Sequence, residues 1–540
     1  MSKINLGNMP DRSVASTGNH PNAALSYEEG TDDITVAKLQ LFTQVASCLV
    51  REKRDTLLQK RDTLLLESIY TVMAADPRFI LQLAVYARNT LHLRSLPVVL
   101  LGEAASNPRL YLDENGRSLI TEYTPRIIRR PDEVTELLAY VSQGASYGDQ
   151  GPAGKMLPNA LRRGLERAMR SFDEYQLGHY NRASGGFSMR DALRLVHPRP
   201  SSPAQSAMFA YLAGRPANMK LLPKTTAMLR LLGKDELDAE AVELLRAGYV
   251  TWQVALSHFG NHKELWEATL RHMGYMDILR NLRNMLNAGV DEDTLCSYIT
   301  DSGRVKRSRL LPYRFFAAAD ILNRSGHGGR IQNALAQAFE MAVENAPRLE
   351  GKTLLCLDFS ASMGDRISQD SMITYKDVAS ILGAICVARM QADICIFASN
   401  AAWVYLRNED GALTNVKNLE NLGMLHDSVG INTLGWRAIA LATESRRIYD
   451  RIIVLSNMQL YNDYGPEDKA RSLPHHLNIY RQTLNQETRC LCVDMGGDGT
   501  AQVPPDDPLS LVVEGWTENI LTLADIWERS GGILREIERL

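Results

Sequence analysis

The stretch Thr353-Leu354-Leu355-Cys356-Leu357-Asp358-Phe359-Ser360-Ala361-Ser362-Met363 decides the fold of this chain. Its apolar residues before Asp358 are typical of a strand that is buried on both faces, as strands of parallel sheets are. Asp358, Ser360 and Ser362 follow at alternate positions where the strand ends. Open parallel sheets bind their ligands at that end. The stretch therefore predicts a parallel sheet with a ligand site after its first strand.

The chemistry of this D-x-S-x-S stretch suits a metal ion. One carboxylate and two hydroxyls are ligands for a hard divalent cation such as Mg²⁺, which takes oxygen ligands in octahedral geometry. The alternative is a turn rich in Ser and Asp, because both residues cap helices and shape turns. A magnesium ion is the predicted cofactor, and the turn remains the alternative.

The hydrophobic pattern changes at this stretch. From about residue 33 to 347, apolar residues recur at spacings of three and four between short turns, which predicts paired helices of the HEAT type, with a compact bundle as the alternative. Afterwards, segments 393–397, 451–456 and 489–494 read as buried strands, with helices near 374–390, 434–446 and 522–539. This alternation predicts a doubly wound α/β sheet.

Length and composition agree with a multidomain protein. A chain of 540 residues is too long for one core. Residues 1–32 are polar, which predicts a disordered tail rather than a signal peptide, followed by a helical domain at 33–350 and a sheet domain at 351–540. No apolar run reaches the roughly 18 residues of a membrane span. The seven cysteines lack C-x-x-C spacing, so we expect reduced thiols and a cytoplasmic protein.

Charge is distributed unevenly along the chain. Residues up to Glu350 carry a net charge of +5 and the remainder −8, within a total of −3. An excess of positive charge in the helical half favours a polyanionic partner for that half.

Two predicted helices within residues 155–199 each have a basic face. Arg163, Arg167 and Arg170 lie opposite an apolar face that includes Leu161 and Leu165. The helix that begins after Ser188 repeats the arrangement. Guanidinium groups bind phosphates, and aromatic rings stack on unpaired bases, whereas the alternative is a solvated charged face. The predicted RNA-binding residues here are Lys155, Arg162, Arg163, Arg167, Arg170, Arg190, Arg194 and His197, with Tyr175, Tyr180 and Phe187 as stacking candidates.

A second basic region lies further along the chain. Segment 304–314 has five cations and no acid, and we expect it to be a loop that leads into a helix. Just upstream, helix 276–287 has Arg and Asn residues on its polar face, which either bind RNA or tie neighbouring helices together. The candidates from this region are Arg280, Arg283, Lys306, Arg307 and Arg309.

Four motifs in a fixed order resemble the TROVE-domain Ro autoantigen family over about residues 33 to 540. They are the run H-M-G-Y-M-D-I-L-R-N-L-R-N-M at 272–285, the segment S-R-L-L-P at 308–312, the helix at 188–197 and the D-x-S-x-S stretch. The resemblance implies a ring of HEAT-like helices closed by a von Willebrand factor A domain. It also implies binding of small non-coding Y RNAs on an outer basic surface and of single-stranded 3′ ends of misfolded RNAs in the central hole.

The resemblance further implies a role in RNA quality control without catalysis, with an exoribonuclease as a possible partner and with neither DNA nor a membrane as one. One departure concerns the start of the Y-RNA helix. Animal members commonly have His-Lys-Asp there, whereas this chain has Met189-Arg190-Asp191. A histidine contact is therefore absent at position 189, and the basic neighbour is kept.

The family's metal-ion-dependent adhesion site adds a Thr and an Asp from two further loops. Thr433 is the second-loop candidate here, and Ser456-Asn457 replaces the expected Thr-Asp of the third loop. The predicted metal ligands are thus Asp358, Ser360, Ser362 and Thr433, with Asn457 as a weak contributor, because a neutral amide holds a divalent ion less strongly than a carboxylate.

Enzyme motifs are absent from the sequence. Gly351-Lys352-Thr353 resembles the end of a phosphate-binding P-loop, but Ala346 stands where the first glycine is needed. No G-x-S-x-G, H-E-x-x-H or metal-spaced Cys/His pattern occurs. The alternative to RNA binding is therefore a protein-adhesion module, in which a partner's carboxylate completes the metal's coordination.

Overall fold

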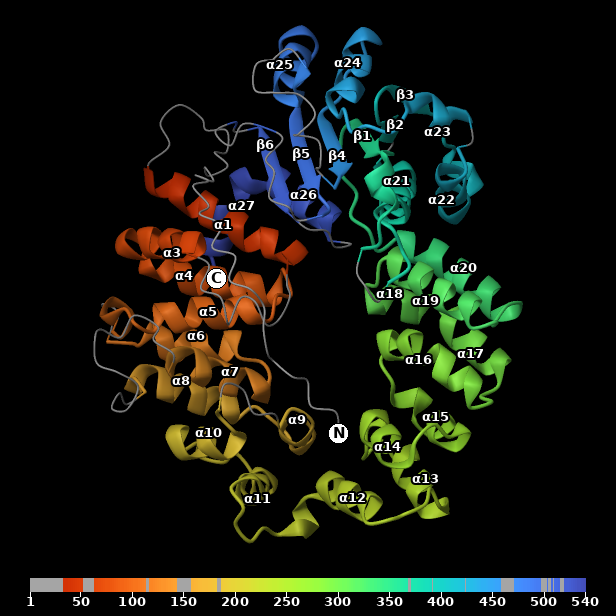
Figure 1. Cartoon of the computed structure of the whole chain (residues 1–540). Coiled ribbons are helices and arrows are strands. Elements are labelled where there is room, and N and C mark those ends of the chain that lie inside the picture. The colour runs from red at the N-terminus through yellow and green to blue at the C-terminus, as the bar shows by residue number, and fades with distance from the viewer. Residues whose placement is uncertain are drawn as a thin grey trace, which may run out of the picture.

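The computed structural model describes residues 33–51, 63–112, 116–142, 157–181, 186–367, 371–390, 392–422, 424–457, 471–496, 503, 507, 509–514 and 519–540. The predicted tail at 1–32 and the candidate Lys155 lie outside these residues. The described chain begins as a helical array that bends into two arms (Figure 1).

The first arm consists of short helices that pack as neighbours along the chain. Helix α4 illustrates why they form: Pro77 occupies its first position, and the Asp76 carboxylate accepts a hydrogen bond from the backbone of Phe79. The helices are α1 (Asp33–Arg51), α3 (Thr63–Ala75), α4 (Pro77–Asn89), α5 (Ser95–Ala104), α6 (Leu119–Ile127), α7 (Pro131–Ser142), α8 (Asn159–Met169), α9 (Glu174–His179), α10 (Met189–Val196) and α11 (Pro203–Leu212).

The second arm returns toward the sheet through another series of helices. They are α12 (Pro223–Leu232), α13 (Ala239–Arg246), α14 (Trp252–Phe259), α15 (Lys263–Thr269), α16 (Tyr275–Asn287), α17 (Glu292–Ile299), α18 (Ser302–Ser308), α19 (Pro312–Arg324) and α20 (Arg330–Val343). The array confirms the predicted HEAT-like helices.

A six-stranded sheet follows, with the order β3-β2-β1-β4-β5-β6. The strands are β1 (Thr353–Asp358), β2 (Ala392–Phe397), β3 (Ala401–Val404), β4 (Arg451–Ser456), β5 (Arg489–Asp494) and β6 (Ser510–Glu514). All neighbouring strands are parallel except β3, which pairs antiparallel with β2. The doubly wound sheet is confirmed, but the sequence did not predict β3 and β6.

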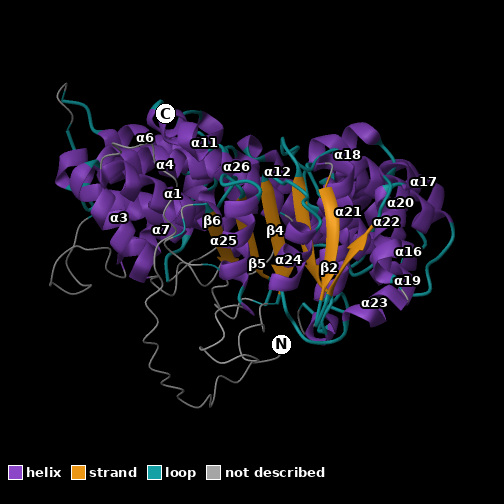
Figure 2. Ribbon diagram, turned by 90° about the horizontal axis from the view of Figure 1, so that it is seen from above, coloured by secondary structure: helices purple, strands orange, loops and turns teal. Residues whose placement is uncertain are grey.

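Helices cover both faces of the sheet, as Figure 2 shows. They are α21 (Tyr375–Met390), α22 (Ala412–Glu420), α23 (Met424–Val429), α24 (Trp436–Glu444), α25 (Leu473–Thr483), α26 (Ile520–Glu528) and α27 (Ser530–Glu538). Alternate residues of β1 enter different cores: Leu354 and Cys356 join the cluster with α24 and α25, whereas Leu355 and Leu357 join the main core. The described cysteines are unpaired thiols, as expected.

Two helix predictions were wrong in detail. Segment 304–314 is not a loop, because the Asp301 carboxylate accepts a hydrogen bond from the backbone of Arg304 and begins α18 one turn earlier. Arg309 then adopts a left-handed conformation, which ends that helix. The predicted helix 522–539 is two helices, α26 and α27, separated at Arg529 just before two glycines.

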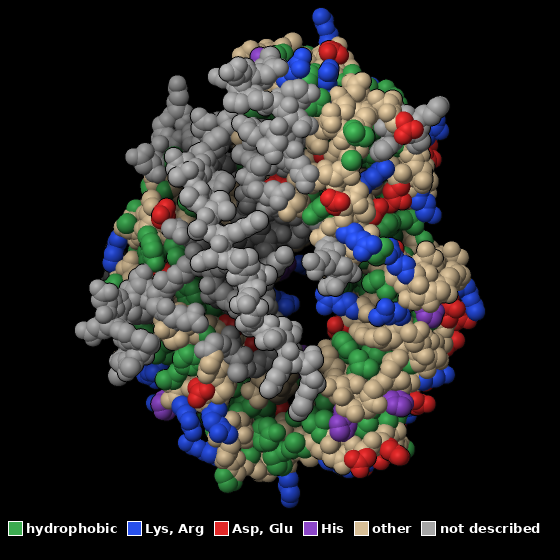
Figure 3. Space-filling model, viewed as in Figure 1, with side chains coloured by type: hydrophobic (Ala, Val, Ile, Leu, Met, Phe, Trp, Pro, Cys, Tyr) green, Lys and Arg blue, Asp and Glu red, His purple; other side chains and the backbone are tan. Residues whose placement is uncertain are grey.

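The last helices join the sheet to the first arm. The Gln82 amide donates to the carbonyl of Glu538 at 2.7 Å, and Lys38 pairs with the Glu538 carboxylate at 2.7 Å. Arg126 donates to the carbonyl of Leu540 at 2.6 Å. Apolar residues of α26 and α27 share one core with α1 and α4. The two arms and the sheet therefore form a closed ring around an opening (Figures 1 and 3). In the described part of the chain, no helix is both long and apolar enough to cross a membrane.

Candidate nucleic-acid interface

Helix α8 has the two faces that its sequence predicts. Leu161 and Leu165 are fully buried, whereas Arg163, Arg167 and Arg170 are exposed. The apolar face packs mainly on α6, and the arginines lie on the opposite side. The sequence prediction of a basic stripe is confirmed for this helix.

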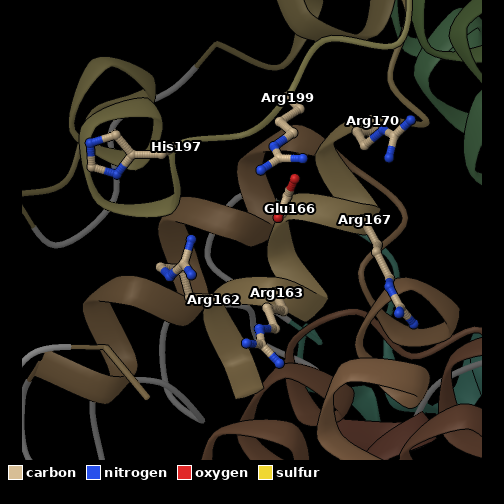
Figure 4. A pocket seen from close by; sticks show the side chains of 7 residues that line it. All are labelled: Arg162, Arg163, Glu166, Arg167, Arg170, His197 and Arg199. Atoms are coloured by element: carbon tan, nitrogen blue, oxygen red, sulfur yellow. The ribbon is translucent and has the colours of Figure 1, made fainter. Parts of the chain in front are cut away.

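The stripe forms one wall of a pocket of about 560 Å³. The other wall is the segment that follows α10, where His197 takes a left-handed conformation and caps the helix. Arg162 connects the two walls, because its guanidinium donates to the carbonyl of Val196 at 3.4 Å. Figure 4 shows the lining residues, which are Arg162, Arg163, Glu166, Arg167, Arg170, His197 and Arg199.

The charges in this pocket are not neutralised by neighbours. Among the described residues, Arg163, Arg167 and Arg170 form no ion pair, although Arg residues on helix surfaces usually have a Glu or Asp within reach. Unpaired guanidinium groups on a rigid helix can bind phosphates without first breaking another contact. The pocket therefore has the positive charge and the free hydrogen-bond donors that binding of a polyanion requires.

The basic face of α10 is only partly joined to this pocket. The helix begins after Ser188, as predicted, and Ser188 and Asp191 form a capping box. Arg190 and Arg194 are exposed, but they do not line the pocket. The Arg190 guanidinium lies beside Gly214, where a Cβ would displace it. Of the residues predicted on α10, only His197 thus lines the pocket with α8.

A second basic cluster, which we call the inner cluster, lies where the two arms meet. Exposed Arg94 and Arg129 flank Arg88, whose guanidinium pairs with the buried Glu133 carboxylate at 2.6 Å. Burial lowers the pKa of Arg88 and raises the pKa of Glu133, and the neighbouring arginines lower the pKa of Arg88 further. Arg309 of the second arm reaches the same region and donates to the His92 ring.

Aromatic residues of α9 adjoin the inner cluster. The Arg130 guanidinium lies 4.2 Å from the ring centroid of Tyr180, and His179 stacks on Tyr175 with centroids 5.4 Å apart. Helix α9 lies beside the opening of the ring in Figure 1. Figure 3 shows Lys and Arg side chains around that opening. Such rings can stack on bases of a single strand. Phe187, the third stacking candidate, is half-buried and packs against the core.

The candidates on the second arm are exposed but lie on separate helices. Arg280 and Arg283 are on α16, and Lys306 and Arg307 are on α18. The polar face of α16 also ties helices together, because the Asn284 carbonyl accepts a hydrogen bond from Asn261. The structural alternative raised by the sequence therefore applies to this helix, and RNA binding by Arg280 and Arg283 stays a prediction.

The predicted metal ligands converge at the end of β1. The buried Asp358 carboxylate accepts hydrogen bonds from the Ser360 backbone at 2.8 Å and from the Ser456 hydroxyl at 2.5 Å. The hydroxyl oxygens of Ser360 and Ser362 are 3.2 Å apart, and Ser362 donates to the Asn457 amide oxygen at 3.1 Å. Burial raises the pKa of Asp358 to about 6, although its hydrogen bonds act in the opposite direction.

The spacing of the oxygen ligands in this set fits a magnesium ion, but the ligands carry little negative charge for a divalent cation. Adjacent ligands of octahedral Mg²⁺ lie about 3 Å apart, which is close to the two oxygen separations at Ser362. Asp358 is the one carboxylate in the set, and no group of three or more His, Cys, Asp or Glu side chains suited to a metal occurs in the described chain. Thr433 is buried in the adjoining loop, and its hydroxyl makes no hydrogen bond to the set among the described residues. Metal binding stays a prediction.

Sequence reasoning missed several residues of these sites. Arg94, Arg129 and Arg130 belong to the inner cluster, and the adjacent pair Arg129-Arg130 was the available signal. Arg199 is one of many cations in the sequence, and its place in the pocket follows the left-handed conformation of His197 at the end of α10.

The comparison with protein families gives a clear result. A model of the TROVE domain matches residues 20–227 and 244–332, which is more than half of the chain. The chain belongs to the TROVE-domain family. The predicted family is thereby confirmed.

Individual relatives of this TROVE-domain chain are distant. The RNA-binding protein RO60 of Deinococcus radiodurans is 25% identical over 356 residues, which cover 61% of this chain and 60% of the relative. Telomerase protein component 1 of Rattus norvegicus is 25% identical over 361 residues, or 55% of this chain and 13% of the relative. The crystal structure of the Deinococcus radiodurans RO (RSR) protein matches with a TM-score of 0.72 at 18% identity, over 91% of this chain and 99% of that one. The chain thus spans less than two thirds of these two sequence relatives, and the structural match supports the fold.

Proposed function

We propose that this TROVE-domain chain is a non-catalytic RNA-binding protein of RNA quality control. The observation that supports the proposal best is the pocket on α8, which is lined by several guanidinium groups that form no ion pair within the described part of the chain. Phosphates of structured RNA neutralise such groups and release counterions. The RNA-binding protein among the relatives, RO60, adds to this support. A small non-coding RNA of the Y type is the proposed ligand of this outer pocket.

The opening of the ring is the proposed site for single-stranded 3′ ends. The inner cluster offers cations to the phosphates, and Tyr175 and Tyr180 offer rings to the bases. A closed ring excludes a stable duplex from a narrow opening but admits one strand. RNA that is misfolded or incompletely trimmed carries such ends, so an exoribonuclease is a fitting partner protein.

A second candidate function is protein adhesion through the end of β1. The spacing of the Ser360, Ser362 and Asn457 oxygens favours it, because these oxygens can surround a Mg²⁺ ion and leave positions for a partner's carboxylate. The two functions are compatible, since the basic pocket and the D-x-S-x-S stretch lie on different elements.

The test of RNA binding is a salt titration. The affinity of the full chain for a small hairpin RNA should be measured by fluorescence anisotropy at several salt concentrations. The proposal predicts a steep decrease in the binding constant with salt, with a slope of about 0.7 to 0.9 per phosphate contact. A binding constant that does not change with salt, or no binding at low salt, would contradict it.

A further inference from the structure

Glu166 is the one acidic residue that lines the outer pocket. It projects from α8, and Figure 4 shows its carboxylate directed toward Arg199, with Arg162, Arg163 and Arg167 on the other side of it. The side chain is half-buried.

The ordinary role for such a residue is an ion pair within the helix. Glu166 stands four residues from both Arg162 and Arg170 and three residues from Arg163, and these are the spacings at which helical pairs form. The structure shows none of these pairs. Within the described residues, the Glu166 carboxylate has neither an ion pair nor a hydrogen bond. It is therefore available to a ligand.

A carboxylate in this place weakens the binding of phosphate alone. Two like charges in contact repel each other, and the repulsion is stronger near a protein surface than in bulk water. A site that recognised only the RNA backbone would bind more tightly without Glu166. An ionised carboxylate accepts hydrogen bonds and donates none, so it selects a ligand group that carries N–H or O–H. Phosphates have no such group, whereas nucleosides have base amino groups and the ribose 2′-hydroxyl.

We propose that Glu166 accepts a hydrogen bond from a nucleoside donor, so that the pocket recognises an unpaired nucleotide and not only its phosphates. The arginines on either side bind the flanking phosphates, and the carboxylate between them reads the nucleoside. This inference rests on the proposed RNA binding at α8, and it adds specificity to that site. Carboxylates are known acceptors for the cytosine amino group.

The experiment compares hairpins that share one stem and differ in the loop. The loops consist of cytidine, uridine or 2′-deoxycytidine, and affinities are measured for the wild type, Glu166→Ala and Glu166→Gln. Because a well-placed base contact contributes about 1 to 3 kcal/mol, the wild type should prefer cytidine by roughly fivefold or more over the loop that lacks the relevant donor. Preference over uridine identifies the amino group, and preference over 2′-deoxycytidine identifies the hydroxyl.

The two variants separate recognition from charge. Under the proposal, Glu166→Ala loses the preference between loops, and its affinity rises for the loop that lacks the contacted donor: uridine if the donor is the amino group, 2′-deoxycytidine if it is the hydroxyl. Glu166→Gln keeps part of the preference because its amide oxygen still accepts a hydrogen bond. Equal wild-type affinities for the three loops, with the same gain for every loop in both variants, would overturn the inference.

A variant of two pocket arginines distinguishes RNA binding at α8 from nucleoside recognition by Glu166. If Arg163→Ala/Arg167→Ala loses affinity for all loops while Glu166 has no effect on preference, RNA binding at α8 stands and this inference fails. If the double arginine variant binds as the wild type does, RNA binding at α8 itself is wrong. Thermal unfolding of each variant controls for folding, which should be unchanged because none of these side chains forms a hydrogen bond or ion pair within the described residues.

Discussion

The Arg309 guanidinium donates a hydrogen bond of 3.1 Å to Nε2 of His92, which lies 217 positions earlier in the chain. His92 follows α4 on the first arm, and Arg309 ends α18 on the second arm. Both residues adopt left-handed backbone conformations, with φ of 56° and 55°. This contact joins the two arms beside the inner cluster, independently of the packing of α26 and α27.

The contact should make ring stability depend on pH. Burial lowers the pKa of His92 below its ordinary value of 6.5, and the nearby charges of Arg309 and Arg88 lower it further. The unfolded chain therefore binds a proton near pH 6.5 before the folded chain does. The His92 contribution to the free energy of unfolding is complete above pH 6.5 and decreases as the pH falls toward the lowered pKa.

His92→Gln tests this dependence, because glutamine accepts the hydrogen bond from Arg309 without titrating. Thermal unfolding should be compared at about pH 7.5 and about pH 5.5, the range in which histidine changes charge. The wild type should lose more stability than the variant. An equal loss in the two proteins would show that His92 does not titrate between folded and unfolded states in this range.

The pocket arginines should carry the affinity for structured RNA. Arg163→Ala/Arg167→Ala is expected to weaken binding by about 1 kcal/mol or more for each residue and to reduce the salt slope, because hydrogen bonds from charged donors are lost. Arg190→Ala should cost less, since Arg190 lies outside the pocket.

Arg230→Ala is the matched control, because Arg230 is an exposed helix arginine that pairs with Glu240. Anisotropy titrations at two salt concentrations distinguish these cases. If the double variant and the control behave alike, the stripe on α8 is solvated surface.

Single-stranded 3′ tails should bind in addition to the stem. A hairpin with a tail of several unpaired nucleotides is expected to bind more tightly than the same blunt hairpin, since only the tail can enter the opening. Arg94→Ala/Arg129→Ala should reduce this advantage, because both side chains are exposed in the inner cluster. A competition assay between the tailed and blunt hairpins gives the ratio directly. A ratio of one in the wild type would contradict entry of the tail.

Metal binding at the end of β1 should be weak, and substitutions of the ligand residues should change its affinity. Asn457→Asp is expected to tighten Mg²⁺ binding because it adds a carboxylate beside Ser362, and Asp358→Ala is expected to abolish it. RNA affinity should remain near the wild-type value in both variants, since the basic pocket lies on other elements. Calorimetric titration with Mg²⁺ decides the matter. Three identical isotherms would make the D-x-S-x-S stretch a structural turn.

The sequence predicted those features that depend on local pattern. Leu161 and Leu165 at helical spacing predicted the buried face of α8, and the mostly apolar residues 353–357 predicted β1. Strands β3 and β6 were not predicted, because short strands at the edge of a sheet have weak hydrophobic patterns. Segment 304–314 was wrongly predicted to be a loop. Its many cations give no clear helical pattern, and the residue that starts α18 is the cap Asp301, which precedes the segment.

The sites were harder to predict because they depend on the return path of the chain. Arg163 and His197 share one pocket only because the chain turns back after α10. His92 and Arg309 meet only because the ring closes. In the sequence, Glu166 has the spacing of an ordinary ion-pair residue on a helix. Within the described structure, its carboxylate forms none of these ion pairs. No local pattern in the sequence carries such information.

The central claim is that the outer pocket and the opening of the ring both bind RNA. Ultraviolet crosslinking of a tailed hairpin RNA, followed by mass spectrometry of the crosslinked peptides, tests it most directly. The account predicts that stem nucleotides crosslink to peptides within residues 159–199 and that tail nucleotides crosslink to α9 and to residues 88–94. Crosslinks confined to the sheet after residue 350, or absent from both regions, would contradict it.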